Sequence, residues 1–410
     1  MADGLRQLFQ QEFTKMVAVI SRLYGLQHIE LAEDIVGETF LAAAENWGQK
    51  GMPANPTAWL YTVAKNRAIY HFRRLNIYEH KVIPMIKAQQ NGEETEEPDF
   101  SEENIRDSQL QMMFAVCDPA IASEAQIGLA LRILCGFGID EIAGAFFTSK
   151  ETINKRLFRA KEKLRAEKVR MEFPPEAVLP ARLDNVLRII YLLFNEGYYS
   201  RSKDQILQKD LTVEALRLGL LLADFPATAS PKTYALIALM CFHASRFEAR
   251  QTADRPSILY EEQDPSLWDQ GLIRQGMHYL DRSAQGEELS SYHLEARIAY
   301  WHCIKEDTPE KWAEILELYD RLLGLNFSPG AALNRIFALY KVSGRKAALA
   351  AAESLKLEDD HFYFLLLGEL YTGVDDGKAK LNYQQAYQLA RTQTEKEGIQ
   401  QKLAALVKNI

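Results

Sequence analysis

Apolar residues recur every three or four positions through most of the chain, and no stretch alternates as a strand would. The segment Ile139–Arg165 shows the pattern most clearly. Its second half carries one apolar stripe at about 100° per residue, made of Ile153, Leu157, Ala160 and Leu164. Thr148 and Glu151 have the spacing of a capping box, which predicts that a helix begins there. We therefore expect two short helices joined by a tight turn.

The side of this second helix that faces away from the stripe is polar and basic. It carries Glu151, Thr152, Lys155 and Arg159. A basic outward face, a buried stripe and a short preceding helix are typical of a helix-turn-helix, whose second helix enters the major groove. From spacing alone, a solvated amphipathic hairpin with surface lysines is an equally good interpretation.

The first 75 residues predict three further helices: Leu5–Leu23, Ile29–Trp47 and Thr57–Arg74. Asn55 is a good N-cap for the third, with Pro56 at its first position. This third helix interleaves aromatic rings with basic side chains. Rings stack on bases and cations offset phosphate charge, so the pattern suits melted or single-stranded nucleic acid. The alternative is a core helix with its aromatics turned inward.

The rest of the chain predicts a linker and a long helical region. Residues 76–108 are acidic and poor in apolar residues, as expected of an extended or disordered linker. Helical periodicity resumes at Leu110, and from Ala181 onward helices of about 12 residues follow one another through short turns. The last pairs resemble tetratricopeptide repeats in a degenerate form. The predicted fold class is all-α.

Composition limits the function without identifying it. The 410 residues carry a formal net charge of −8, yet Lys150–Arg170 holds nine Lys and Arg against three Glu, and such a local patch can bind DNA. The four cysteines form no CxxC pair, and the start lacks the apolar core of a signal peptide. We expect a cytoplasmic protein without a membrane span. No nucleophile–base pair, metal-spaced histidines or phosphate loop is evident, so we expect neither an enzyme nor a cofactor.

Three collinear motifs give the first 170 residues a resemblance to bacterial sigma factors of the extracytoplasmic-function (ECF) group. They are AEDIVGETF at Ala32–Phe40, PTAWLYTVAKNRAIYHFRR at Pro56–Arg74, and the helix-turn-helix with its trailing RLFRAKEKLR at Arg156–Arg165. The first resembles the region 2 helix that docks on the β′ clamp helices of RNA polymerase. The second resembles the segment that melts and reads the −10 element. The third resembles region 4, which reads the −35 element.

Motifs in the second half resemble the ECF subgroup with a long C-terminal helical extension. They are YLLFNEGYYS at Tyr191–Ser200, EEQDPSLWDQGLI at Glu261–Ile273, YHLEARIAYWHC at Tyr292–Cys303, and the repeat-like stretch Leu318–Leu349. The domains implied are 1–75 for region 2, 76–108 for the acidic linker, 109–172 for region 4, and 181–410 for a helical regulatory domain. The polar clusters in this half, at Asn195–Tyr199 and at Glu261–Asp269, predict buried hydrogen-bond networks or internal contacts rather than catalysis.

The resemblance implies partners and residues for each motif. The partners are core RNA polymerase, through its β′ clamp helices and β flap, and promoter DNA. Polymerase docking is assigned to Asp34, Glu38, Thr39 and Phe40. The −10 element is assigned to Asn55, Trp59, Lys65, Asn66, Arg67, Arg73 and Arg74, with the loop 48–54 as a pocket for a flipped base. The −35 element is assigned to Thr152, Asn154, Lys155, Arg156 and Arg159.

Several alternatives stay open at this stage. Tyr70 stands where the family often has Asp, which could alter −10 contacts, and the turn Phe146–Thr148 is bulky for a helix-turn-helix. The linker either threads the polymerase or is a plain tether. The C-terminal domain either packs on the sigma domains or contacts polymerase. A helical scaffold with a degenerate helix-turn-helix, or a simple repressor, are the competing function classes.

Overall fold

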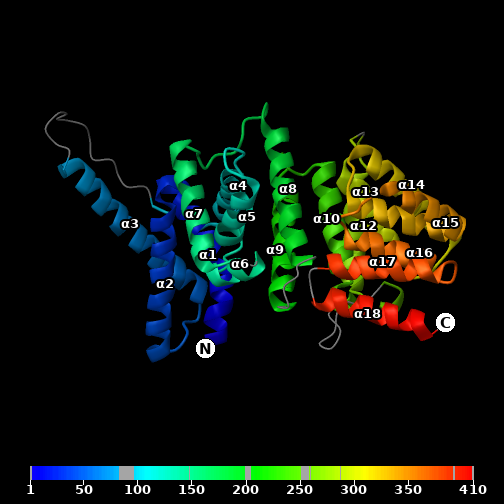
Figure 1. Cartoon of the computed structure of the whole chain (residues 1–410). Helices are drawn as coiled ribbons and strands as arrows, with labels where there is room; N and C mark the ends of the chain where they lie inside the picture. The colour runs from blue at the N-terminus through cyan, green and yellow to red at the C-terminus, as the bar shows by residue number, and fades with distance from the viewer. Residues whose placement is uncertain are drawn as a thin grey trace. The chain divides into compact units, whose positions relative to one another are not determined.

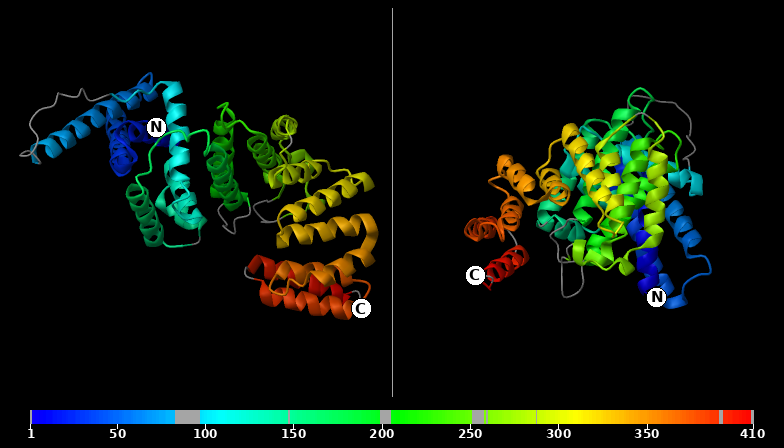
Figure 2. Two further views of the ribbon diagram at one scale, coloured as in Figure 1. Left: turned by 90° about the horizontal axis from the view of Figure 1, so that it is seen from above. Right: turned by 90° about the vertical axis from the view of Figure 1, so that its right-hand side faces the viewer.

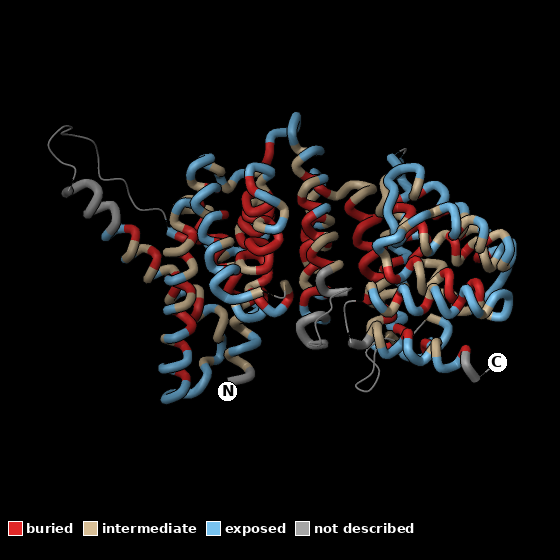
Figure 3. The backbone as a smooth tube through the Cα atoms, in the orientation of Figure 1, coloured by how far each residue is buried: buried red, intermediate tan, exposed pale blue. Residues whose placement is uncertain are grey.

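The computed structural model describes residues 2–82, 97–146, 148–198, 205–250, 258, 260–286, 288–390 and 393–408. Within these ranges the regular structure is entirely helical, which confirms the all-α prediction. The chain forms two compact units, Met1–Ala229 and Ser230–Ile410. Each has its own apolar core (Figures 1 and 3).

The first unit begins with three helices, α1 (Ala2–Tyr24), α2 (Ile29–Lys50) and α3 (Pro56–Val82). The Asn55 side chain accepts a hydrogen bond from the Ala58 backbone amide at 3.0 Å, so the predicted N-cap is confirmed. On α3 a stripe at i, i+4 spacing faces the core: Leu60, Ala64, Ala68 and Phe72. α3 continues to Val82, eight residues beyond the predicted end.

The acidic linker is shorter than predicted. Residues 76–82 belong to α3 and residues 102–108 belong to α4 (Glu102–Val116), so both ends of the predicted segment are helical. Ser101 caps α4 by accepting a hydrogen bond from the Asn104 amide. Glu102 and Glu103 then occupy the first turn, where the helix dipole favours negative charge. The acidic residues at the end of the predicted linker therefore stabilise the start of a helix. Residues 83–96 lie outside the described ranges.

Three helices follow: α5 (Ser123–Leu129), α6 (Ile139–Ala145) and α7 (Lys150–Ala166). α5 continues directly into a π-helical turn, η2 (Ala130–Leu134). All four residues of the predicted apolar stripe on α7 are buried. The predicted cap is wrong by one residue. Ser149, not Thr148, is the N-cap, and its hydroxyl accepts a hydrogen bond from the Thr152 amide.

Two more helices complete the first unit, α8 (Leu179–Tyr198) and α9 (Gln205–Ala223). α8 packs on α4 and α5 through polar contacts as well as apolar ones. Arg182 pairs with Asp118 at 2.9 Å and donates to the Phe114 carbonyl at 2.7 Å, and the Asn185 amide donates to the Cys117 carbonyl at 2.5 Å. The chain after residue 181 therefore contacts the helix group that contains the predicted helix-turn-helix.

The second unit is a succession of helices. Its elements are α10 (Pro231–Ala244), α11 (Phe247–Arg250), α12 (Gln270–Ser283), α13 (Ser291–Trp301), α14 (Pro309–Leu325), α15 (Pro329–Leu355), α16 (His361–Tyr371), α17 (Asp376–Leu389) and α18 (Gln393–Lys408). From α13 onward each helix packs against the next (Figure 2). α15 is broken at Gly344, where φ is 78°, a conformation that glycine adopts readily. This break divides α15 into two helical halves, 329–343 and 345–355.

Candidate nucleic-acid and polymerase interfaces

One face of α3 is exposed and combines an aromatic ring with cations. Ala58, Thr62, Asn66 and Tyr70 follow one another at four-residue spacing, and Arg73 and Arg74 extend the face by one turn. The Tyr70 side chain is 63% exposed. Opposite this face, the Phe72 ring stacks on Tyr24 with centroids 3.5 Å apart, which fixes the rotation of the helix. Asn66, Arg73 and Arg74 therefore point to solvent, as their proposed role requires.

The other −10 candidates are engaged within the fold. Trp59 packs edge-on against Trp47 with centroids 5.3 Å apart and is only partly exposed. Lys65 pairs with Glu97 at 2.6 Å, and Arg67 forms an ion pair with Glu38 of α2. The Asn55 side chain caps α3. Of the seven predicted −10 residues, Asn66, Arg73 and Arg74 are exposed on one face of α3, and the other four make contacts within the protein.

The segment Glu97–Phe100 lies along α3. Phe100 stacks on Tyr61 with centroids 4.7 Å apart, and Tyr61 donates a hydrogen bond to Glu12 of α1 at 2.5 Å. The hydrogen bond and charge of Lys65 lower the pKa of the Glu97 carboxyl, so it stays ionised beside the base. The described end of the acidic segment thus pairs with Lys65 of α3.

Two of the four residues predicted to dock on polymerase are exposed on α2, and two are buried. Asp34 and Glu38 are exposed, but Thr39 is 0% exposed and bonds the Ile35 carbonyl at 2.8 Å, and Phe40 is 6% exposed against the Phe9 ring. Thr39 and Phe40 are core residues here and offer no surface to a partner.

The large apolar side chain that α2 exposes to solvent is that of Leu41, one position after Phe40, and it is 61% exposed. It lies at i+3 from Glu38 and at i+7 from Asp34, so the three share one face of the helix. The sequence reasoning missed it because the motif draws attention to the aromatic ring. Counting helical positions from the buried Ile35 and Val36 would have found it.

The −35 candidates lie on the exposed side of α7. Thr152, Asn154, Lys155 and Arg159 are exposed. Arg156 is partly buried: it pairs with Glu124 of α5 at 3.3 Å and lies over the Phe146 ring at 5.7 Å. Phe147, in the predicted turn, lies outside the described ranges.

A shallow groove of about 510 Å³ lies between α5 and α7 at the surface. The basic side chains of α7 line one wall, and small residues such as Ala122 and Ala125 line the other. Outside this groove, Phe158 of α7 is 62% exposed and was not among the predicted −35 residues. Small residues opposite a basic helix leave room for a strand backbone, which suits contact with phosphates.

A family profile for sigma-70 region 2 matches residues 8–76, which span α1, α2 and the exposed face of α3. The chain contains a sigma-70 region 2. This match supports a sigma-70 family sigma factor, with a role in binding core RNA polymerase and in promoter recognition. Residues 182–284 match a family described as "Family of unknown function (DUF6596)".

A relative matches most of this chain. An uncharacterized protein of Rhizobium meliloti (strain 1021) is 34% identical over 350 residues, which is 84% of this chain and 82% of the relative. No solved structure matches the chain. Because the match covers 350 residues, it extends well past region 2, and the relative shares part of the helical C-terminal half.

The second polar cluster of the C-terminal half, Glu261–Asp269, makes hydrogen bonds, but its four acidic residues are exposed, so the prediction of a buried network is wrong for them. Lys305 donates to the carbonyls of Tyr260, Glu261 and Gln263 at 2.8 to 3.1 Å. Asp264 and Asp269 cap the following helical turns. The first cluster, Asn195–Tyr199, lies largely outside the described side chains.

Lys311 is buried beside this network and carries a shifted pKa. Its ammonium donates to the Tyr260 hydroxyl at 2.9 Å and to the Ile304 carbonyl at 2.5 Å, and only 1% of the residue is exposed. Burial lowers the pKa of Lys311 to about 8. The lysine thus ties the loop before α14 to Tyr260, which is a structural role.

The part of the chain that the structure describes contains no helix long and apolar enough to cross a membrane. Among the same residues, no three His, Cys, Asp or Glu side chains are grouped so that they could hold a metal ion.

Proposed function

We propose that this chain is an ECF-type sigma factor whose C-terminal helices form a tetratricopeptide-like regulatory extension. The observation that carries the proposal is the exposed face of α3, where Asn66, Tyr70 and Arg73 lie together inside the segment that matches sigma-70 region 2. α2 would dock on the β′ clamp helices through Asp34, Glu38 and Leu41.

The face of α3 suits a melted −10 element for a chemical reason. Unpaired bases expose their π faces, and stacking on an aromatic side chain contributes about 1–3 kcal/mol per base. Tyr70 offers such a ring next to two guanidinium groups that can offset backbone phosphates. A ring at this position, where the family often has Asp, would strengthen stacking in place of an acidic contact.

The −35 element would be read by α7. Thr152, Asn154 and Lys155 lie in its first two turns, the part of a recognition helix that contacts base edges. Arg159 lies one turn further on and would clamp a phosphate. Because Arg156 already pairs with Glu124, we assign it to holding α7 on α5 and not to base contacts.

The extension would regulate the sigma domains. Apart from the linker 76–108, whose two ends are helical, the domain limits 1–75, 109–172 and 181–410 remain predictions, as does the tetratricopeptide-like character of the extension. The packing of each helix from α13 to α18 against the next supports a repeat-type solenoid. The contacts of Arg182 and Asn185 with α4 and α5 support a mechanical link between the extension and the −35 reader.

Transcription by core RNA polymerase on sheared genomic DNA tests this proposal. Added full-length protein should create a set of new RNA 5′ ends whose upstream DNA shares one −10 and one −35 sequence. The control variant combines Thr152→Ala, Asn154→Ala and Lys155→Ala, which should weaken the −35 preference and leave the −10 preference in place. If no new 5′ ends arise, or if they share no upstream sequence, the proposal is wrong.

A further inference from the structure

Three polar side chains of the second unit are buried, and each has one atom without a hydrogen-bond partner. They are the guanidinium of Arg246, the amide of Gln263 and the indole of Trp268, and these residues are 6%, 6% and 5% exposed. Among the described residues, no group bonds Arg246 Nε, Gln263 Oε1 or Trp268 Nε1. Native proteins satisfy most buried polar atoms, because an unpaired one costs free energy. Three such atoms in one stretch of chain indicate a place where another molecule binds.

The three side chains lie around one aromatic ring, that of Tyr260. The guanidinium carbon of Arg246 is 5.6 Å from the ring centroid, and the Trp268 ring is stacked on it at 6.4 Å. The imidazole of His302 approaches the same ring edge-on at 5.1 Å, and its Nδ1 is also buried without a partner. The Gln263 backbone amide donates to the Tyr260 carbonyl at 3.3 Å and so ends the turn η3 (Tyr260–Glu262). We call Arg246, Tyr260, Gln263, Trp268 and His302 the Tyr260 site.

Arg246 gives the Tyr260 site a positive charge that lacks a counter-ion. Arginine stays protonated inside proteins, and a buried charge without an opposite charge beside it is destabilising. Two acidic side chains near the site, Glu261 and Asp307, both pair with Lys341 instead, at 3.3 and 3.1 Å. Across the described residues, no carboxylate lies within ion-pair distance of Arg246. An anion beside Arg246 would supply the missing charge.

Two lysines add to the positive charge around Tyr260. The ammonium groups of Lys305 and Lys311 lie 5.0 and 5.1 Å from the centroid of the ring. Each ammonium donates three hydrogen bonds within the protein, Lys305 to three backbone carbonyls and Lys311 to two carbonyls and the Tyr260 hydroxyl. The lysines therefore hold the surrounding loops and favour an anion by their charge. Arg246 and Trp268 are the residues with a donor left for it.

The unpartnered atoms indicate which anion fits. Arg246 Nε and Trp268 Nε1 can only donate, so they require oxygen acceptors such as those of a carboxylate or a phosphate. The nitrogen of the Gln263 amide donates to the Ile258 carbonyl at 3.2 Å, which leaves its oxygen to accept from a hydroxyl. Burial and the charge of Arg246 lower the pKa of His302 to about 3, so its ring is neutral and adds no charge. A small oxyanion with a hydroxyl group meets these requirements.

Two segments of the second unit build the site, and solvent reaches it. Arg246, Tyr260, Gln263 and Trp268 precede α12, whereas His302 follows α13. Tyr260 and His302 are each partly exposed, so the buried donors lie behind a surface that a small molecule can approach. A ligand that contacts both segments would also stabilise the second unit, because it binds only the folded form.

We propose that the Tyr260 site binds a small oxyanion that carries a hydroxyl group, either a phosphate or a hydroxycarboxylate. Its oxygens accept hydrogen bonds from Arg246 and Trp268, and its hydroxyl donates to Gln263. The site gives the helical extension a ligand of its own. It is a property of the second unit and does not depend on the function proposed for region 2.

The first test follows the indole N–H signals of the full-length protein labelled with ¹⁵N-tryptophan. Trp268→Phe, which keeps a ring and removes the donor, identifies the Trp268 signal. Inorganic phosphate and glycolate are each titrated at constant ionic strength made up with chloride. At least one of them should move the Trp268 signal downfield in a saturable way, because a hydrogen bond to an anion deshields the proton. The signal of Trp59, in the first unit, should stay in place.

Two pairs of anions test the hydroxyl. Phosphate keeps a P–OH group at neutral pH and sulfate has none, while glycolate is acetate with a hydroxyl added. A ligand without the hydroxyl leaves Gln263 Oε1 unpaired, so the hydroxylated member of one pair should bind about tenfold or more tightly than its counterpart. The pair that shows this preference distinguishes a phosphate site from a hydroxycarboxylate site. Gln263→Met should abolish the preference, and equal binding within both pairs overturns the hydroxyl contact.

A matched pair of variants separates the Tyr260 site from general charge. Arg246→Gln should weaken binding about tenfold or more, because the anion loses its counter-charge. Arg297→Gln, the same change at an exposed arginine of α13, should bind like the unmodified protein. Thermal unfolding without anion shows whether each variant folds, and added anion should raise the Tm of the unmodified protein by more than that of Trp268→Phe.

Three results overturn the inference. The first is that neither phosphate nor glycolate gives a saturable shift at concentrations up to roughly 50 mM, where even very weak binding would show. The second is equal anion binding by Arg246→Gln and Arg297→Gln. If Arg246→Gln does not fold, Trp268→Phe decides, and a Tm gain equal to that of the unmodified protein is the third.

Discussion

Replacing Arg73 and Arg74 together by glutamate is expected to reduce promoter-directed transcription by roughly 100-fold or more, because each reversal removes a phosphate contact and adds a repulsion. Both side chains are exposed on α3 and lie outside its core stripe, so the fold should be unaffected. The measurement is run-off transcription with core polymerase at several salt concentrations. For single-stranded contacts, the loss of two phosphates should reduce the log–log salt slope by about 1.4.

A matched variant distinguishes the face of α3 from net charge. Arg6→Glu with Arg106→Glu makes the same change in charge at two exposed positions of the same unit, on α1 and α4. This pair should retain most of the activity. If both double variants lose activity to the same degree, the effect is one of overall charge, and the α3 face has no special role in promoter contact.

Arg182→Ala is expected to destabilise the first unit by about 2 kcal/mol, between the cost of an exposed and of a fully buried ion pair. The substitution removes the pair with Asp118 and leaves the Phe114 carbonyl without this donor. Urea unfolding of the full-length protein measures the loss. Hydrogen exchange should rise in α8 and at the end of α4.

Arg188→Ala on the same helix is the control. Arg188 is exposed and bonds Ser123 and Asn185 at the surface, so its loss should cost less than about 0.5 kcal/mol. Should the two variants lose the same stability, α8 is not anchored on α4 through Arg182, and the proposed link between the extension and the −35 reader loses its support.

Local features of the fold were predictable because they depend on neighbouring residues. The apolar stripe of α7 follows from the helical period, and the Asn55 cap follows from the chemistry of a free backbone amide. The misplaced cap at Thr148 shows the limit of this reasoning. Thr148 and Ser149 both carry a hydroxyl that can cap a helix. Only Thr148 has a Glu three residues later, yet the N-cap in the structure is Ser149.

The exposure of single residues was harder to predict than the helix that carries them. Phe40 was expected at the polymerase interface, and the structure buries it against Phe9 of another helix while Leu41 faces out. The motif identifies α2 as the helix expected at the interface. The rotation of α2 is set by its packing against α1, and the residues of α2 alone give no information about that packing.

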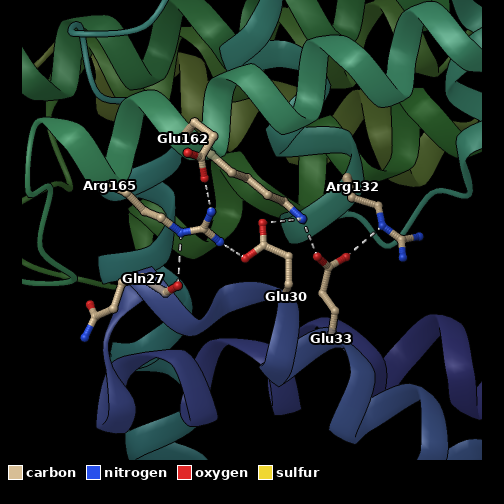
Figure 4. Close-up of polar contacts among 7 residues, drawn as sticks. Gln27, Glu30, Glu33, Arg132, Glu162 and Arg165 are labelled. Atoms are coloured by element: carbon tan, nitrogen blue, oxygen red, sulfur yellow. Dashed lines mark hydrogen bonds and ion pairs between the residues drawn. The ribbon is translucent and has the colours of Figure 1, made fainter. Parts of the chain in front are cut away.

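The ion pair between Glu33 and Lys161 (Figure 4) was not predictable from the sequence for a similar reason. The two residues are 128 positions apart, and each by itself is an ordinary charge on an amphipathic helix. Packing between the helices of the first unit brings them together and leaves both side chains mostly buried. Contacts between helix groups are non-local, so periodicity carries no information about them.

Co-elution with core RNA polymerase that lacks any sigma factor tests the central claim most directly. The full-length chain and the unit Met1–Ala229 are each mixed with core enzyme and separated by size. We predict that the full-length chain elutes with the polymerase, and a different affinity for the shorter form would assign the removed helices an inhibitory or supporting role. If neither form elutes with core enzyme, the chain does not act as a sigma factor, and its partners must be sought among ligands of the helical extension.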